Sequence, residues 1–206
     1  MITRRKFIKW GLEAGAATAL VGGLSLLPAK RDYIRPPGAA EAAFLHRKCI
    51  KCGACVEVCP THAVEQIDLS LDIKNLATPV LNPHSGGCIA WRRKCLKCIA
   101  ACPTDALKMP DSLTGIKLGN VSIDRPPCVN CMACLRICPV KGAVLFPNPE
   151  GAPFVREEDI PTRLKLVNSP VKPYIDNSVC VGCGLCVNIC PVTVMVLTPM
   201  AGGKPA

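Results

Sequence analysis

Sixteen cysteines in a chain of 206 residues fall into four blocks, and their spacing limits the possible folds more than any other feature. In three blocks, two residues separate each of the first three cysteines, three residues precede the fourth, and a proline follows. The other block has six residues in its first gap but is otherwise regular. The blocks are Cys49, Cys52, Cys55, Cys59 and Pro60; Cys88, Cys95, Cys98, Cys102 and Pro103; Cys128, Cys131, Cys134, Cys138 and Pro139; and Cys180, Cys183, Cys186, Cys190 and Pro191. A spacing that recurs in this way indicates a repeated binding unit.

The spacing is typical of bacterial ferredoxins, whose thiolates bind [4Fe–4S] clusters and whose fourth cysteine commonly serves the other cluster of a pair. Zinc sites usually take two separated cysteine pairs instead. A disulfide framework fits an even cysteine count in an exported chain, but it does not explain the repeated spacing. We therefore predict that all sixteen cysteines are ligands and that the chain binds four [4Fe–4S] clusters.

The composition indicates that bound clusters replace much of the usual core. Hydrophobic residues make up 50% of the chain, but aromatic residues make up only 4%. Each cluster would tie four backbone positions together, so cluster binding is coupled to folding. We expect the chain without iron to be largely unfolded.

A net charge of +10 is at first sight typical of proteins that bind nucleic acid or membranes. Part of this charge lies in the first 29 residues, and each oxidised cluster with its four thiolates carries about −2. The loaded chain is then close to neutral, so we expect no nucleic-acid partner.

The N-terminal segment, residues 1–29, resembles a twin-arginine export signal. Arg4 and Arg5 are flanked by Thr3, Lys6 and Phe7, and a stretch rich in glycine and alanine follows. This export route moves folded proteins, which suits a chain that receives its clusters before transport. The charge-free stretch 14–29 is shorter than the roughly 20 residues that span a bilayer, so cleavage is favoured over retention as a weak anchor. In both cases the clusters are expected on the periplasmic face of the cytoplasmic membrane.

The remaining chain is expected to be α+β, with two modules like bacterial dicluster ferredoxins and long loops. An extended entry segment (30–48) precedes a four-cluster domain (49–198), and a flexible tail (199–206) follows. Each cysteine loop is expected to lead into a short helix that the proline ends, and then into a short apolar strand. Upstream strands are predicted at 116–118 and 121–123 around a turn, and at 174–176. The proline-rich residues 147–173 are expected to form a strap along the surface, or else a docking arm.

The four blocks can pair sequentially or in a nested manner. Nesting is favoured because the first and fourth blocks both have a glycine directly after the second cysteine, Gly53 and Gly184. Blocks one and four would then pair around an inner module at about 80–146, formed by blocks two and three. The nested ligand sets are Cys49, Cys52, Cys55 with Cys190; Cys180, Cys183, Cys186 with Cys59; Cys88, Cys95, Cys98 with Cys138; and Cys128, Cys131, Cys134 with Cys102.

The irregular second block leaves the role of Cys88 open. The six residues of its first gap, four more than in the other blocks, are either a loop between two true ligands or a special feature of the site. That feature would be a docking knob built on Trp91 and the three cations that follow it, or a shifted cluster potential. The three histidines, His46, His62 and His84, are expected to be surface residues because the cysteines already suffice as ligands.

The order of these features resembles the NapG/MauM family of periplasmic ferredoxin-type subunits of quinol dehydrogenases. The resemblance is carried by the twin-arginine segment, Arg35-Pro36-Pro37-Gly38-Ala39, Phe44 and the four blocks. It implies an integral membrane partner that oxidises quinol and a periplasmic c-type cytochrome or reductase that accepts the electrons. Regular spacing in the third block departs from the family and leaves the acceptor open.

Two other roles stay open: the iron–sulfur subunit of a molybdopterin oxidoreductase or hydrogenase, and a maturation factor that supplies electrons. No constellation of catalytic residues is evident, so we expect a non-catalytic electron-transfer subunit. A Gly-rich nucleotide fingerprint is also missing from the sequence, so no nucleotide cofactor is expected.

Overall fold

The computed structural model describes residues 32–39, 42–69, 75–124, 126–165 and 169–200. The chain divides into two compact units, Met1–Arg31 and Asp32–Ala206, and every described residue belongs to the second. The predicted export signal (1–29) and residues 201–206 of the predicted tail lie outside the described residues. Within the described ranges, no helix has both the length and the apolar character that a bilayer crossing requires.

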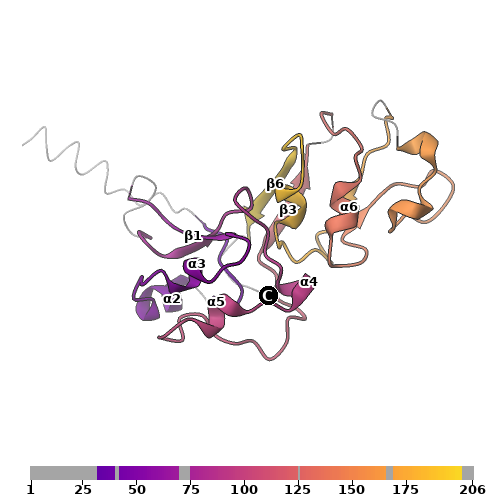
Figure 1. Cartoon of the computed structure of the whole chain (residues 1–206). Coiled ribbons are helices and arrows are strands. Elements are labelled where there is room, and N and C mark those ends of the chain that lie inside the picture. Colours follow the sequence, from indigo (N-terminus) through magenta and orange to yellow (C-terminus); the bar gives the residue numbers. More distant parts are fainter. Residues whose placement is uncertain (1–31, 40–41, 70–74, 125, 166–168, 201–206) are drawn as a thin grey trace, which may run out of the picture. The chain divides into compact units, whose positions relative to one another are not determined.

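All regular elements of the described part are short (Figure 1). The helices are α2 (Ala42–Lys48), α3 (Ala54–Glu57), α4 (Ala90–Arg93), α5 (Lys97–Ala100), α6 (Ala133–Ile137) and α7 (Leu185–Asn188), with 3₁₀ turns η1 (Glu157–Asp159) and η2 (Thr162–Leu164). The strands are β1 (Val64–Gln66), β2 (Pro79–Leu81), β3 (Gly119–Ile123), β4 (Val144–Leu145), β5 (Tyr174–Ile175) and β6 (Met195–Pro199). Helices α3, α5, α6 and α7 each begin two residues after the second cysteine of a block, which confirms the predicted loop and helix.

The first two blocks form one module, residues 34–108, called module I. Strand β1 follows block one and pairs antiparallel with β2, which precedes block two, with Val64 opposite Leu81. An isolated antiparallel bridge joins Ala39, before block one, to Leu107, after block two. Helices α3 and α5 of the two blocks pack together. Module I therefore has an inner strand pair between its blocks and an outer contact around them.

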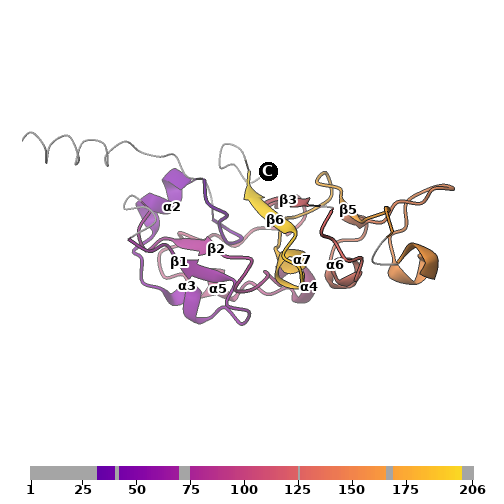
Figure 2. The same cartoon turned by 90° about the horizontal axis from the view of Figure 1, so that it is seen from above.

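The last two blocks repeat this plan in module II, residues 119–199. Strand β4 follows block three and pairs with β5 before block four, while β3 before block three pairs with β6 after block four. The β3–β6 pair is seen side by side in both views (Figure 1 and Figure 2). Helices α6 and α7 pack together. The predicted strand at 174–176 is confirmed as β5, whereas the predicted hairpin around Gly119 and Asn120 is wrong because both residues lie inside β3.

The nested pairing expected from the sequence, with an inner module at about 80–146, is also wrong. In module II the β4–β5 pair lies between blocks three and four, and the β3–β6 pair lies outside both blocks. In module I the β1–β2 pair lies between blocks one and two, and the Ala39–Leu107 bridge lies outside them. The shared glycines Gly53 and Gly184 have a local cause. Both cap their helices with left-handed backbone, at φ 79° and 78°, which glycine adopts without a steric cost. They mark a turn shape and carry no information about which blocks pair.

One hydrophobic cluster extends through both modules. It contains Ile34 and Leu81 of module I together with Val121, Val187 and Leu197 of module II. Smaller clusters lie at module I, around Leu45 and Ile99, and below the strap, around Phe146. Because a shared core resists relative sliding of packed elements, the two modules are held in fixed contact.

Arg35, in the entry segment, anchors module I to its inner strand pair. Its guanidinium donates to Thr78 Oγ1 at 2.8 Å, to the Pro79 carbonyl at 2.7 Å and to Asn75 Oδ1 at 2.8 Å. Thr78 is fully buried and Asn75 is nearly so. Loss of the guanidinium would remove a hydrogen-bond donor from each of these buried acceptors, which lowers the stability of the folded state.

We predict that Arg35→Ala lowers the unfolding free energy of the cluster-loaded protein by about 2–4 kcal/mol. Arg35→Lys is expected to recover only part of this, because an ammonium cannot reproduce the planar fork of donors. The control is Arg156→Ala, since Arg156 makes only exposed ion pairs. Thermal loss of cluster absorbance, measured anaerobically, ranks the variants. Equal losses for Arg35→Ala and Arg156→Ala would contradict the anchoring role.

Candidate metal centres

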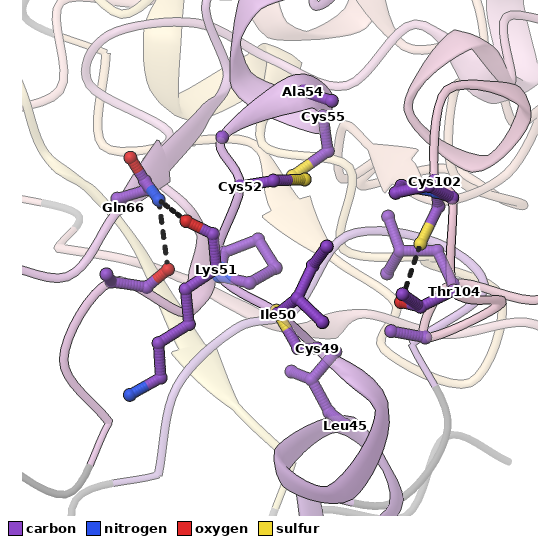
Figure 3. Close-up of a pocket in the computed structure, with 16 residues that line it drawn as sticks. Leu45, Cys49, Ile50, Lys51, Cys52, Ala54, Cys55, Gln66, Cys102 and Thr104 are labelled. Carbon is purple, nitrogen blue, oxygen red and sulfur yellow. Dashed lines mark hydrogen bonds between the residues drawn. The ribbon is translucent and has the colours of Figure 1, made fainter.

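A cavity in module I brings together the first three cysteines of block one and the last cysteine of block two. It is lined by Cys49, Cys52, Cys55 and Cys102, together with apolar residues such as Leu45. Figure 3 shows the four cysteines around this cavity: Cys49 and Cys52 on the loop before α3, Cys55 in α3, and Cys102 on the chain after α5. We call these four cysteines set A.

A cavity in module II shows the matching arrangement. It is lined by Cys138, the last cysteine of block three, and by the first three cysteines of block four, Cys180, Cys183 and Cys186. The rest of the lining is mostly apolar and includes Val121 from β3. We call these four cysteines set C.

The other eight cysteines complete the pattern. Cys88 and Cys98 lie close enough to Cys59 to interact with it electrostatically, and Cys98 also interacts with Cys95. These four form set B: Cys59, Cys88, Cys95 and Cys98. In block three Cys134 interacts with Cys131 and Cys128, and Cys190 is the cysteine that remains in module II. These four form set D: Cys128, Cys131, Cys134 and Cys190. Each set therefore takes three cysteines from one block and the fourth from the other block of the same module.

Left-handed backbone shapes the loops around the second cysteine of each block. The residues before and after it have positive φ in three blocks: Lys51 and Gly53, Asn130 and Met132, and Gly182 and Gly184. Successive residues of this kind turn backbone N–H groups toward one side and form anion-binding concavities, which occur at many Fe–S sites. The loops thus provide N–H donors where a negatively charged cluster would lie.

Polar contacts hold the first of these loops in place. The Gln66 side chain, on β1, donates to the Lys51 carbonyl at 3.2 Å and to the Ala77 carbonyl at 3.1 Å (Figure 3). Cys102 Sγ lies 3.9 Å from Thr104 Oγ1, and Cys59 Sγ lies 3.7 Å from Thr61 Oγ1. The fourth cysteine of both module I blocks is therefore followed by a hydroxyl two residues later.

All sixteen cysteines lie within the described ranges, and all are free thiols. Burial raises the pKa of Cys55 and Cys98 to about 11, and that of Cys88 and Cys183 to about 12; neighbouring cysteines add to each rise. Burial also raises the pKa of Cys186. Buried thiols of this kind are protonated at neutral pH unless a metal stabilises the thiolate.

The irregular block forms an extra turn without displacing its cysteine. Residues 89–94 contain α4, and Lys94 keeps the left-handed backbone found before the second cysteine of the other blocks, at φ 52°. Trp91 packs against the shared core and its Nε1 donates to the Leu113 carbonyl at 3.2 Å. Arg92 and Arg93 are exposed. This geometry favours the loop interpretation over a docking knob, because the indole packs against the protein's own core and bonds to the protein's own backbone.

The strap, residues 147–173, folds against block three. Met132, Phe146 and Ile160 form a buried cluster there. Lys172 donates from Nζ to the Cys128 carbonyl at 2.7 Å, and Asn130 donates to the Val171 carbonyl at 2.9 Å. Sequence spacing gave no sign of these contacts. The described residues of the strap therefore lie against block three.

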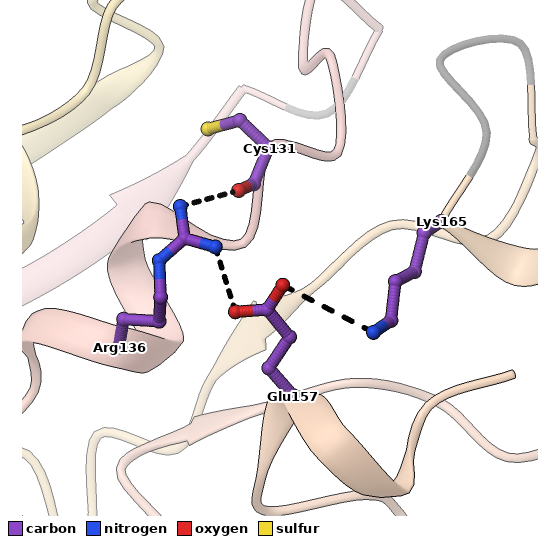
Figure 4. A network of polar contacts seen from close by, with 4 residues as sticks. All are labelled: Cys131, Arg136, Glu157 and Lys165. Carbon is purple, nitrogen blue, oxygen red and sulfur yellow. Dashed lines mark hydrogen bonds and ion pairs between the residues drawn. The ribbon is translucent and has the colours of Figure 1, made fainter. Parts of the chain in front are cut away.

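An ion pair closes the strap over the loop of set D (Figure 4). Arg136, on α6, donates to Glu157 Oε2 at 2.7 Å and to the Cys131 carbonyl at 3.1 Å. Lys165 Nζ lies 4.0 Å from the other carboxylate oxygen of Glu157. The pair joins the strap to the backbone of a candidate ligand.

The chemistry of the four sets fits iron–sulfur clusters. Thiolates are the ligands of such clusters, and sets A and C each offer four of them around a mostly apolar cavity. Of the histidines, His62 and His84 are exposed and His46 is half-buried. Among the described residues, no three His, Cys, Asp or Glu side chains are grouped closely enough to hold one metal ion.

Comparisons with known proteins agree with this chemistry. A family model for a 4Fe-4S dicluster domain matches residues 88–143 and 127–194, and one for a 4Fe-4S binding domain matches residues 44–65. The match at 127–194 covers blocks three and four of module II. The match at 88–143 joins blocks two and three, which belong to different modules in space.

Two relatives extend the similarity over most of the chain. The methylamine utilization ferredoxin-type protein MauM of Paracoccus denitrificans is 29% identical over 92% of this chain and 86% of its own length. The protein of that name from Methylophilus methylotrophus is 31% identical over 91% of this chain and 81% of its own length. The chain belongs to the MauM/NapG family of ferredoxin-type proteins. It is thus an iron–sulfur electron-transfer protein.

Part of this MauM/NapG-family chain is also similar to a subunit of another electron-transfer complex. The NAD(P)H-quinone oxidoreductase subunit I of Gloeobacter violaceus is 34% identical over 39% of this chain and 32% of its own length. A match of that length shows only a shared stretch. The family assignment rests on the longer matches.

Proposed function

We propose that the chain binds four [4Fe–4S] clusters and passes electrons on the periplasmic side of the cytoplasmic membrane. In this proposal a membrane partner that oxidises quinol is the donor, and a periplasmic c-type cytochrome or reductase is the acceptor. The observation that supports the proposal most is the presence of sixteen free thiols, eight of which gather as two four-cysteine sets (A and C), each around a cavity. Membership of the MauM/NapG family supports the choice of partners.

In this role the chain's own residues bind the clusters, donate hydrogen bonds to them and shield them from water. The thiolates of sets A to D hold the clusters, which supply one-electron transfer when bound. Left-handed loop residues such as Lys51 and Asn130 present N–H groups to them. Apolar residues around sets A and C keep water away, and solvent exposure is one of the factors that set cluster potentials.

The relatives favour a second candidate function. Both MauM proteins are named for methylamine utilization. An exported enzyme of such a pathway could receive electrons from this chain while it is being assembled, rather than during respiration. The two candidates share the cluster chemistry and differ in the partner.

Anaerobic affinity purification from detergent-solubilised membranes, followed by mass spectrometry, separates the candidates. A multi-span partner, together with cluster reduction by added quinol, supports the quinol-linked role. A co-purifying exported enzyme in an unfinished state supports the second candidate. A molybdopterin or nickel–iron catalytic subunit would overturn both.

Export by the twin-arginine route gives a separate prediction. Replacing Arg4 and Arg5 by lysine is expected to retain the chain in the cytoplasm, because the arginine pair is read by a receptor and its charge alone does not suffice. Lys9→Arg, which also keeps the charge, is the control and should leave export intact. Immunoblots of cytoplasmic and periplasmic-side fractions measure the outcome. Unchanged distribution of the double variant would refute the predicted location.

A further inference from the structure

We propose that the backbone contact between Cys88 and Cys183 is the electron junction between the two modules, and that Gly87 is the positioning residue that keeps this junction short. The proposal rests on the proposed binding of four clusters. It adds an order to the four sets: A, B, C and then D. The junction is thus a specific place at which two dicluster modules become a single electron path.

The contact joins one cysteine of set B directly to one cysteine of set C. The Cys88 N–H donates to the Cys183 carbonyl at 2.7 Å. The path from one cluster to the next would therefore run through two ligands and one hydrogen bond. Electron tunnelling slows steeply with distance, so a direct contact between ligands is the favourable route.

Contacts within each module supply the other two steps. Cys98 of set B lies near Cys55 of set A. Cys186 of set C lies near Cys134 of set D. When clusters are bound, a one-electron transfer along this order would oxidise the donor by one unit and reduce the acceptor by one unit, with no bond made or broken. The junction at Cys88 is what connects the two pairs.

Glycine is required at position 87 because two backbones meet there. A Cβ on Gly87 would lie 2.6 Å from Leu185 Cα and 2.7 Å from Leu185 N. Real Cβ atoms essentially never come that close to backbone, so any side chain must push the modules apart. We call this contact between residues 84–88 of module I and residues 183–188 of module II the seam. The Asn188 amide also donates across it, to the His84 carbonyl at 3.2 Å. The seam is tight and is held on both sides of Gly87.

Exposure of the cysteines supports the same order. Cys52 of set A and Cys131 of set D are exposed, whereas every cysteine of sets B and C is buried or half-buried. The sets at the two ends therefore offer a ligand to partners at the surface. The middle sets are shielded, as expected for clusters that exchange electrons only within the protein.

Electron paramagnetic resonance of the fully reduced protein tests the junction without measuring any activity. Reduced clusters carry unpaired spins, and neighbouring spins broaden and split each other's signals. In the unaltered chain we expect a spectrum that requires coupling across the seam. A spectrum reproduced fully by two independent pairs of clusters would overturn the proposal. Because no partner is present, this result does not depend on the donor or acceptor of the proposed function.

Two double variants isolate the junction. Cys52→Ala with Cys131→Ala removes one ligand each from sets A and D, so the two clusters left are those of sets B and C, and we expect them to be coupled. Cys95→Ala with Cys180→Ala leaves sets A and D, and we expect two uncoupled signals. Coupling in the second variant and its absence in the first would assign the contact to the other clusters and refute the order.

Gly87→Ala tests the positioning role. We expect normal iron content and intact coupling within each module, but loss of the coupling between sets B and C. Gly151→Ala is the control, since a Cβ there would meet only the Asn148 side chain at an ordinary 3.6 Å. Full coupling in folded Gly87→Ala protein would refute the role of Gly87. If this variant does not fold, the unaltered chain and the double variants still decide whether the junction exists.

Discussion

Chelation of iron from the anaerobically purified protein is expected to unfold most of the chain. The longest described helix has seven residues and the longest described strands have five. Helices and two-stranded ladders of this size are not stable by themselves in water. Four clusters that each join two blocks would supply the missing cross-links. The fold and the metal are therefore expected to be lost together.

Far-ultraviolet circular dichroism and limited proteolysis measure this loss, with anaerobic incubation without chelator as the control. Iron loss is expected to be faster at lower pH. Burial raises the pKa of Cys88 and Cys183 to about 12, so protons compete with iron for these sulfur atoms, and acid favours the protonated thiols. An iron-free chain with unchanged dichroism and protease resistance would contradict the account.

Pairing of the blocks gives the second large effect. The structure places Cys49 and Cys102 in the same set, so Cys49→Ala and Cys102→Ala in one chain should remove a single cluster. Cys49→Ala combined with Cys190→Ala should remove two, because Cys190 belongs to set D. Iron is expected to fall from about sixteen atoms per chain to about twelve in the first case and about eight in the second.

The nested arrangement predicts the reverse order, because it places Cys49 with Cys190. Iron and acid-labile sulfide, measured on anaerobically purified protein, distinguish the two. The single variant Cys49→Ala is the control and should match the Cys49→Ala, Cys102→Ala chain. If the Cys49→Ala, Cys102→Ala chain holds less iron than the Cys49→Ala, Cys190→Ala chain, the blocks pair in the nested manner and the module assignment is wrong.

Local structure around the cysteines could be predicted from the sequence because it follows from spacing. Two residues between cysteines require a tight loop, and the proline after the fourth cysteine ends the short helix. The strand after each of blocks one, three and four was also predictable, from apolar runs such as Val194 to Leu197. The candidate ligands follow from the same pattern.

Pairing could not be predicted from the blocks, since the residues that set it lie outside them. The outer contacts are made by Ala39 with Leu107 and by β3 with β6, and these segments carry no cysteine. The need for glycine at position 87 could not be predicted either, because it arises from the backbone of Leu185, which is far away in the sequence. The packing of the strap on Met132 was also hidden, because the contacting residues are far apart in the sequence.

Mössbauer spectroscopy of protein grown on ⁵⁷Fe and purified without oxygen identifies and counts the clusters. We expect about sixteen iron atoms per chain, all in the spectral pattern of [4Fe–4S] clusters. Half that iron, a different cluster type, or cysteines found in disulfides in freshly purified protein would contradict it.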